Sequence, residues 1–346
     1  MKIAIDISPL EKSSLLAHRV RGTGFYIDNL KKSLLKYFPQ NKYIFFTRGE
    51  NLPKDINLVH YTYFEPFFLS LPVIKAQKTV VTVHDLTPLV FKKFFPAGIK
   101  GNFKWQIQKL GLKTANAVIT DSESSKKDII KYTGLPSSRV NVVYLAAGEE
   151  FKRIKNIKNK YNLPEKFVLY VGDVTWNKNL PRLIEAVKKI NVSFVMIGSA
   201  IMQKNFDRSN PWNQDLSKIL KLTEDDKKII KLGFVSQEDL VAIYNLSTVF
   251  AMPSLYEGFG LPILEAMSCG CPVVTTKEGS IQEIAGEAAY YVNAYDVDDI
   301  ANGIGELFFS QKLQQELSEK GLIQAKKFSW KKTAEETIGV YEQATL

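Results

Sequence analysis

Short runs of apolar, often β-branched residues alternate with amphipathic segments along the whole chain. Strands that are buried on both faces read as continuous apolar runs, and helices between such strands imply right-handed β–α–β crossovers. A chain of 346 residues is long for one compact core, so two domains are expected. We therefore predict an α/β protein with two doubly wound domains of similar size. The expected strands cover residues 3–7, 43–47, 57–61, 79–83, 117–120 and 140–145 in the first half, and 167–171, 193–197, 229–232, 249–252, 272–275 and 289–292 in the second.

The change of domain is predicted at residues 146–148. Residues 151–166 follow it and are polar, rich in lysine and weakly patterned, which suits a connection over the surface. We therefore predict a first domain over residues 1–147 and a second domain over residues 148–329.

The net charge of +10 is unevenly distributed. Residues 1–147 carry 22 Lys and Arg against 10 Asp and Glu, whereas the remaining residues carry 24 against 26. A basic first half favours anionic partners: a phosphate-bearing substrate, an acidic membrane surface or a nucleic acid. The plain alternative is that the charge serves solubility alone.

Composition restricts the class of protein further. Cys269 and Cys271 are the only cysteines, and their spacing is typical of buried packing residues rather than of a disulfide or a zinc site. The sequence has no apolar stretch of roughly 20 residues and no signal-like N-terminus. A cytoplasmic location is therefore expected.

Unusual polar and glycine residues stand just past the ends of the expected strands. In open α/β sheets, ligands bind outside the carboxyl ends of the strands. Two such groups fall in each half of the chain, so we expect a cleft between the domains to collect all four. The groups are Gly22 with Gly24, His84 with Asp85, Gly172 with Asn177 and Lys178, and Glu257 with Gly258 and Gly260.

The segment SLYEGFGLPILEAMSCGCPVV is the most informative. Pro262 suits the first position of a helix and Gly270 suits its end, which places Glu265 in the first turn. A carboxylate there can accept hydrogen bonds from a vicinal diol such as a ribose. Glu257 precedes it by eight residues, in a glycine-rich loop, and would reach another part of the same ligand.

The backbone between these glutamates favours a phosphate. Gly258 and Gly260 let the chain approach a ligand closely, and the N–H groups of Phe259, Gly260 and Leu261 point out of the start of a helix. A diol, a diphosphate and a second hydroxyl-bearing group in a row describe a nucleotide-sugar. The alternative is an ordinary loop and helix with both glutamates solvated.

These residues resemble the E-x7-E signature of the retaining glycosyltransferases of family 4, which have the GT-B fold of two Rossmann-like domains facing a central cleft. The resemblance continues through PVVTT and EGSIQEIAG, and in the first half through RGTGFYIDNL, TVHDLTPLVF and ITDSESSKKDI. The segment FSWKKTAEETIGVYE resembles the C-terminal helix of the family, which packs back on the first domain. For this chain that helix is expected over about residues 330–346.

The resemblance implies a role for each donor-site residue. Glu265 would bind the ribose, Glu257 the hydroxyls of the donor sugar, and Lys178 the diphosphate, together with the backbone of residues 259–261. The family commonly has an arginine just before the lysine, where this chain has Asn177. Arg182, one helical turn further on, is a candidate replacement for the missing charge.

In the first half, His84 resembles the family's cleft histidine, which contacts the donor sugar near the reacting bond. Gly22 and Gly24 resemble the loop that passes under the diphosphate. His60 ends an expected strand and His18 lies in a polar segment, and we predict that both are non-catalytic.

The implied reaction transfers a sugar with retention of anomeric configuration, with the departing diphosphate oxygen accepting the proton of the acceptor. Positioning and charge stabilisation then dominate catalysis, so neither a metal nor another cofactor is expected. Asp296 and Asp298 form a D-x-D pair, which we interpret as the cap of a helix rather than a metal site.

HDLTPLVFKKFFP resembles members that add mannose during polysaccharide or O-antigen assembly, which favours GDP-mannose as the donor; UDP-glucose and UDP-N-acetylglucosamine are the alternatives. The aromatic residues in 67–72, 91–96 and 103–109 suit a glycan or lipid-linked acceptor at the anionic inner membrane face; ordinary burial of these residues is the alternative.

Three other classes of function compete with glycosyl transfer. A dinucleotide-binding oxidoreductase would need a third glycine where this chain has Ile27. A nucleic-acid-binding protein would not explain the glutamates, so no nucleic acid is expected as a partner. An epimerase or a phosphorylase of the same fold would differ only in its products. The sequence leaves the oligomeric state open.

Overall fold

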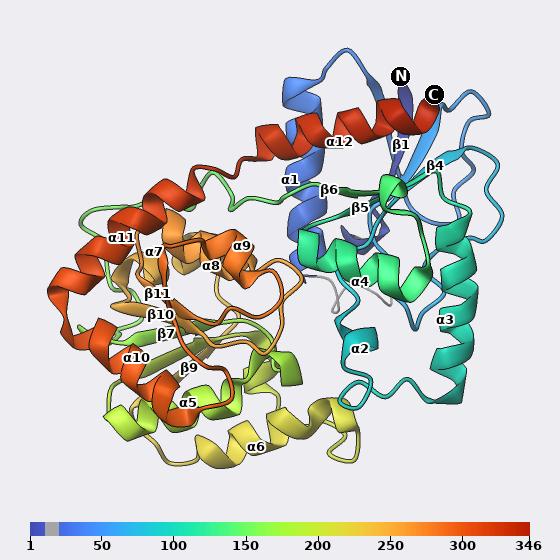
Figure 1. Cartoon of the computed structure of the whole chain (residues 1–346). Helices are drawn as coiled ribbons and strands as arrows, with labels where there is room; N and C mark the ends of the chain where they lie inside the picture. The colour runs from blue at the N-terminus through green and yellow to red at the C-terminus, as the bar shows by residue number, and fades with distance from the viewer. Residues whose placement is uncertain (11–20) are drawn as a thin grey trace. The chain divides into compact units, whose positions relative to one another are not determined.

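The computed structural model describes residues 1–10 and 21–346, which divide into two compact units. The first unit comprises Met1–Ala146 together with Phe328–Leu346, and the second comprises Ala147–Lys327 (Figure 1). None of the described helices is long and apolar enough to cross a bilayer.

The first unit contains a six-stranded sheet in which every neighbouring pair of strands is parallel, in the order β2-β1-β3-β4-β5-β6. Because the order runs outward in both directions from β1 and β3, the sheet is doubly wound. Its strands are β1 (Lys2–Asp6), β2 (Lys42–Phe46), β3 (Leu58–Tyr61), β4 (Lys78–Thr82), β5 (Ala117–Thr120) and β6 (Val140–Val142), and its helices are α1 (Arg21–Tyr37), α2 (Thr87–Val90), α3 (Gly98–Lys113), α4 (Glu123–Thr133) and α12 (Trp330–Thr345).

The second unit repeats this plan, with six parallel strands in the order β12-β11-β10-β7-β8-β9. All twelve strands that the apolar runs predicted are present, and the α/β fold class is confirmed. The strands are β7 (Val168–Val171), β8 (Phe194–Ile197), β9 (Ile229–Gly233), β10 (Val249–Met252), β11 (Val273–Thr275) and β12 (Ala289–Tyr291); the helices are α5 (Leu180–Ile190), α6 (Gln214–Leu222), α7 (Gln237–Leu246), α8 (Leu261–Ser268), α9 (Ile281–Ala285), α10 (Val297–Phe309) and α11 (Gln311–Ala325).

Several helices begin where a side chain can satisfy the first backbone N–H groups. Ser122, Ser236 and Ser329 each accept a hydrogen bond from the backbone three residues further on, which starts α4, α7 and α12. Such a cap stabilises a helix by about 1 kcal/mol. Asp296 caps α10 in the same way, accepting from the N–H of Asp298, so the D-x-D pair serves the start of a helix.

Helix α12 completes the first unit, where it packs along α1 and against β4 (Figure 1). A buried chain of hydrogen bonds ties it to the sheet. His60 Nδ1 lies 2.7 Å from Tyr341 Oη, and His60 Nε2 lies 2.8 Å from Thr82 Oγ1, which in turn bonds to Tyr26. Burial lowers the pKa of His60 to about 3, so its ring is neutral. One ring nitrogen of His60 bonds to α12 and the other bonds to β4, so this side chain links the helix to the sheet.

Candidate functional site

The loop after β10, at the carboxyl edge of the second sheet, carries Glu257, and helix α8, which follows the loop, carries Glu265. The backbone of Gly260 has a φ of +101°, which side-chain-bearing residues rarely adopt, and α8 begins at the next residue. Pro262 therefore occupies the second helical position, where its missing N–H needs no partner. As a result, Glu265 lies in the second turn of α8, and the prediction of the first turn was wrong.

Glu257, in this loop, forms an ion pair with Lys178, which lies in the segment between β7 and α5. Lys178 Nζ donates to both carboxylate oxygens of Glu257, at 2.9 and 2.8 Å. Glu257 is 6% exposed, and the lysine side chain retains 21% of its exposure. The structure thus brings together the two residues that the sequence assigned to the donor sugar and to the diphosphate.

Asn177 holds the same loop in place. Its Nδ2 donates to the carbonyl of Tyr256 at 3.0 Å, and its own carbonyl accepts from the N–H of Leu255 at 2.7 Å. Asn177 is buried, so its side chain supports the loop that carries Glu257. Arg182 bonds instead to Asn179 Oδ1, at 2.8 Å.

The opposite side of the loop is held by residues after β11. Ser280 Oγ lies 3.0 Å from the carbonyl oxygen of Glu257 and 2.9 Å from that of Phe259. At Gly279, a Cβ atom would come within 2.6 Å of the carbonyl oxygen of Glu257, so only glycine fits. Glu257 is therefore positioned by contacts from both sides of the loop.

Glu265 lies in a second, separately built polar position. Tyr244 Oη, from α7, donates to Glu265 Oε2 at 2.9 Å, and both side chains are buried. Burial raises the pKa of Glu265 to about 7, although the Tyr244 hydrogen bond opposes the rise. A carboxyl group in this state can accept hydrogen bonds from a diol and become fully ionised when it does so.

His84 follows β4 in the first unit and forms a buried pair with Asp121. His84 Nδ1 lies 2.7 Å from Asp121 Oδ2, and the histidine ring packs edge-on against Tyr26. Burial lowers the pKa of His84, but the charge and hydrogen bond of Asp121, with the charge of Asp85, outweigh it and raise the pKa overall. Nε2 has no hydrogen-bond partner within the described ranges, which leaves it able to bond a ligand.

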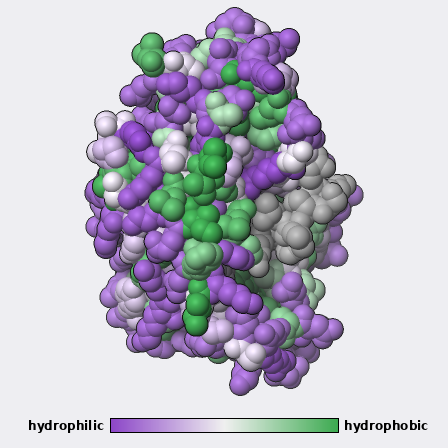
Figure 2. Space-filling model, turned by 90° about the vertical axis from the view of Figure 1, so that its right-hand side faces the viewer, coloured by the Kyte–Doolittle hydropathy of each residue, from purple (hydrophilic) through white to green (hydrophobic). Residues whose placement is uncertain are grey.

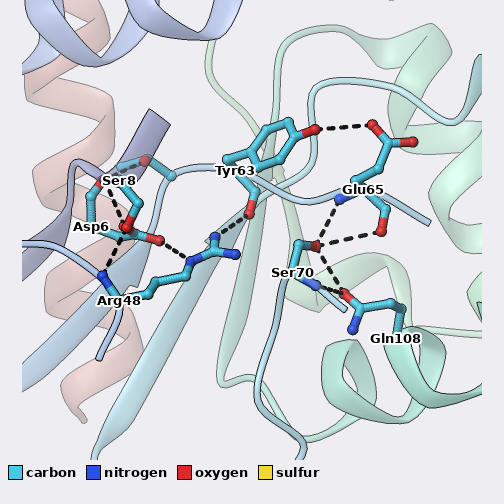
Figure 3. A network of polar contacts seen from close by, with 8 residues as sticks. Asp6, Ser8, Arg48, Tyr63, Glu65, Ser70 and Gln108 are labelled. Atoms are coloured by element: carbon cyan, nitrogen blue, oxygen red, sulfur yellow. Dashed lines mark hydrogen bonds and ion pairs between the residues drawn. The ribbon is translucent and has the colours of Figure 1, made fainter. Parts of the chain in front are cut away.

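A second polar group lies at the same sheet edge of the first unit, which we call the polar edge: Asp6, Arg48, Tyr63 and Glu65. Arg48 Nε donates to Asp6 Oδ2 at 2.7 Å, and its terminal nitrogen donates to the carbonyl of Tyr63 (Figure 3). Tyr63 Oη donates to Glu65 Oε2 at 3.1 Å. Asp6 is fully buried, while a quarter of the Arg48 side chain is exposed. The group thus presents a guanidinium and a carboxylate that are fixed in position.

The predicted glycines lie at the start of a helix in the first unit and after a strand in the second. Gly22 and Gly24 lie in the first turn of α1, and no atom of the described residues lies within 4 Å of where a Cβ of Gly22 would be. Gly172 directly follows β7, where a Cβ would meet Tyr170 Oη at 2.9 Å. His18 lies outside the described residues. The two cysteines are free and buried, as their spacing predicted.

Sequence reasoning missed several residues that hold the site. Asp121 directly follows β5 and Arg48 follows β2 by two residues, so the rule for strand ends would have identified both. Tyr244 lies within α7, and nothing in the local pattern connects it with Glu265. Ser280 lies in the segment EGSIQEIAG, but its contact with the Glu257 loop depends on the tertiary fold.

Two doubly wound parallel sheets with this loop at a carboxyl edge are the architecture of the GT-B fold. Two family models match the chain: "Glycosyl transferases group 1" over residues 150–323, half of the chain, and "Glycosyltransferase Family 4" over residues 8–147. The chain belongs to this family of glycosyltransferases.

Named relatives agree with this assignment. The chain is 34% identical over 272 residues to the serotype-specific mannosyltransferase WbdA of Escherichia coli, covering 74% of this chain and 32% of WbdA. It is 30% identical over 277 residues to the O-antigen chain mannosyltransferase B of Escherichia coli, covering 78% of this chain and 71% of that protein. The matched part thus spans about a third of WbdA.

Solved structures show the same fold at low identity. The sucrose-phosphate synthase of Thermosynechococcus elongatus superposes with a TM-score of 0.77 at 18% identity, over 99% of this chain and 98% of that one. Anabaena Alr3699/HepE in complex with UDP and glucose gives a TM-score of 0.74 at 16% identity, over 98% of each chain.

Proposed function

We propose that this chain transfers mannose from GDP-mannose, with retention of configuration, to a glycan or lipid-linked acceptor in cell-surface polysaccharide synthesis. The observation that supports this most strongly is the pair of buried acids, Glu257 and Glu265, each held by its own partners around the start of α8. Membership of the family and the mannosyltransferase names of two relatives support the choice of reaction and sugar.

Each donor residue has a role that follows from its surroundings. Glu265, buried beside Tyr244, accepts hydrogen bonds from the ribose diol. The backbone of Phe259, Gly260 and Leu261 faces the diphosphate at the positive end of α8. Lys178 stabilises the charge that develops on the diphosphate as the bond to the sugar breaks, and no metal ion is needed for that step in this proposal.

Glu257 orients both the sugar and the lysine. Its carboxylate accepts hydrogen bonds from sugar hydroxyls while its ion pair keeps the Lys178 ammonium at a fixed place. A lysine that is held before the donor arrives needs little reorganisation when charge develops. The departing diphosphate oxygen takes the acceptor proton, so neither glutamate acts as a general base.

The first unit supplies the acceptor side in this proposal. The polar edge offers Arg48 and Glu65 to the hydroxyl or phosphate groups of an acceptor. His84, with Nε2 lacking a partner among the described residues, donates a hydrogen bond to the transferred sugar. Its pKa is raised overall, which increases the protonated fraction of the ring at any given pH and suits a hydrogen-bond donor.

A donor panel tests the proposal. Thermal unfolding is measured with GDP-mannose, UDP-glucose, UDP-N-acetylglucosamine and dTDP-rhamnose, each in large excess. A donor at a hundred times its dissociation constant adds about 2.7 kcal/mol to the free energy of unfolding, so GDP-mannose is expected to raise Tm most. A larger Tm shift with a UDP-sugar would show that the donor is that UDP-sugar and not GDP-mannose, and would leave the class of enzyme unchanged. A flat response to all four would contradict the donor site itself.

A further inference from the structure

Helix α3 of the first unit has one buried face and, opposite to it, an exposed face that carries apolar residues. Gly101, Trp105, Gln108 and Leu112 recur at helical spacing and are buried. The opposite face is exposed, and its apolar residues recur at a similar spacing. On that face Ile99 is 91% exposed, Phe103 68% and Leu110 55%.

The neighbouring segment adds two more exposed apolar side chains, Leu69 at 61% and Ile74 at 92%. We call these two with Ile99, Phe103 and Leu110 the apolar strip. The side of the first unit that carries α3 shows apolar side chains gathered in one band (Figure 2). From Ile99 to Leu110 the helix rises about 16 Å. Large exposed apolar surfaces of this kind mark places where a protein meets a partner or a membrane.

The charges around the apolar strip indicate which kind of partner it binds. Residues 66–120 contain eight lysines, and Asp85 is their one acidic residue. Four of the lysines lie on α3 itself, at positions 100, 104, 109 and 113. Lysines are depleted from protein–protein interfaces, whereas at a bilayer their stems lie along the apolar surface and their ammonium groups reach the lipid phosphates.

Hydrogen bonds also hold together the two segments that carry the apolar strip. Gln108, on the buried face of α3, accepts hydrogen bonds from the Oγ and N–H of Ser70, at 2.9 and 3.1 Å. Ser70 Oγ in turn accepts from the N–H of Glu65 (Figure 3). Lys75 Nζ donates to the carbonyl of Gly111, which ties the segment of Leu69 and Ile74 to the end of α3. The strip and the polar edge therefore share one hydrogen-bonded framework.

We propose that the apolar strip and its lysines dock the first unit on an anionic lipid bilayer. Phe103 and Ile99 enter the boundary between headgroups and acyl chains, and the lysines of α3 pair with lipid phosphates. Docking on this side brings the polar edge close to headgroups at the membrane surface. The benefit of docking for catalysis rests on the proposed function, because it concerns a lipid-linked acceptor. Binding to the bilayer itself needs no nucleotide.

Co-sedimentation with vesicles tests the docking. The full chain is expected to bind vesicles of phosphatidylcholine mixed with phosphatidylglycerol, to release as salt rises, and to bind phosphatidylcholine alone weakly. Phe103→Ser is expected to weaken binding about tenfold, through loss of inserted apolar area. Lys100→Gln with Lys113→Gln is expected to weaken it about 25-fold, since each lysine contributes about fivefold.

Matched variants on the second unit control for apolarity and charge. Phe309 is also 68% exposed, so Phe309→Ser removes an equally exposed ring, and Lys158→Gln with Lys227→Gln removes two exposed lysines. Neither control is expected to change vesicle binding. All variants are expected to keep the wild-type Tm and its rise with GDP-mannose, which separates a failure of docking from a failure of the proposed function.

Equal vesicle binding by wild type and Phe103→Ser, or no salt-sensitive binding by wild type, would overturn the proposal. The alternative partner for the apolar strip is a second copy of the chain. If Phe103→Ser abolished a concentration-dependent dimer in analytical ultracentrifugation and left vesicle binding unchanged, the strip would be a protein interface instead.

Discussion

Replacing Lys178 by methionine is expected to lower kcat/KM for sugar transfer by about 100- to 1000-fold, the range seen when one preorganised charge-stabilising group is removed. Methionine keeps most of the apolar stem and removes the ammonium. The same change leaves the buried Glu257 carboxylate without its ion-pair partner. Removing one member of a fully buried pair costs about 3–5 kcal/mol of stability. The cost here is expected to be smaller, because a fifth of the lysine side chain is exposed.

A double variant separates the two effects. Lys178→Met combined with Glu257→Gln removes both charges, so Tm is expected to return most of the way to the wild-type value while transfer stays lost. Lys320→Met serves as the control, since it breaks an exposed pair with Glu316 whose partners are each 48% exposed. That variant is expected to change neither Tm nor transfer. Normal transfer by Lys178→Met would contradict the role given to the lysine.

Glu265→Ala is expected to weaken the binding of GDP itself by about 10- to 150-fold, the range for losing hydrogen bonds to a charged group. Glu257→Ala is expected to leave GDP binding nearly unchanged and to abolish transfer, since the sugar is the only part of the donor that Glu257 contacts in our proposal. Isothermal titration with GDP, beside a transfer assay, distinguishes the two variants. If both bound GDP like the wild type, the assignment of the ribose to Glu265 would be wrong.

The raised pKa of Glu265 adds a pH dependence to this result. In the free protein its pKa is about 7, because burial disfavours the ionised form. Ribose hydroxyls bond to the ionised form, so binding releases a proton and affinity rises with pH until about pH 8. At about pH 5.5 affinity for GDP-mannose is expected to be more than tenfold weaker than at about pH 8. GDP-mannose suits the titration because its diphosphate has no terminal phosphate to titrate in this range. Glu265→Gln is expected to flatten this dependence.

The raised pKa of Glu265 also determines whether stability rises or falls with pH. The pKa of Glu265 in the folded protein lies above the ordinary 4.5, so between these values the folded chain holds more protons than the unfolded chain. This carboxyl group therefore lowers stability as pH rises from about 4.5 to about 7 in the absence of ligand.

The strands were predictable because a strand buried on both faces must be apolar throughout. Glu257 was predictable as part of a motif within one segment. Lys178 was also predicted as a donor-site residue, but its ion pair with Glu257 was not, because the two residues lie 79 positions apart and the pair forms only when two loops meet. That Asn177 supports the Glu257 loop could not be predicted for the same reason, because its contacts are with the backbone of residues 255 and 256.

The start of α8 was mispredicted for a local reason. Proline suits either of the first two helical positions, so the sequence alone did not decide where α8 begins. The left-handed backbone of Gly260 decides it: α8 begins one residue earlier than predicted, which makes Glu265 its fifth residue and places it in the second turn. The exposed face of α3 was also unpredictable in detail, because its apolar residues are spread over both sides of the helix and only packing shows which side is covered.

Proton NMR of the sugar released from GDP-mannose tests the central claim most directly. In the absence of an acceptor, water takes the place of the acceptor hydroxyl, and the first anomer of mannose to appear reports the stereochemistry before mutarotation mixes the two forms. We expect α-mannose to appear first with the wild-type chain, and no release above background with Glu257→Ala. The initial appearance of β-mannose would contradict retention. Equal release by the wild type and Glu257→Ala would contradict the donor site.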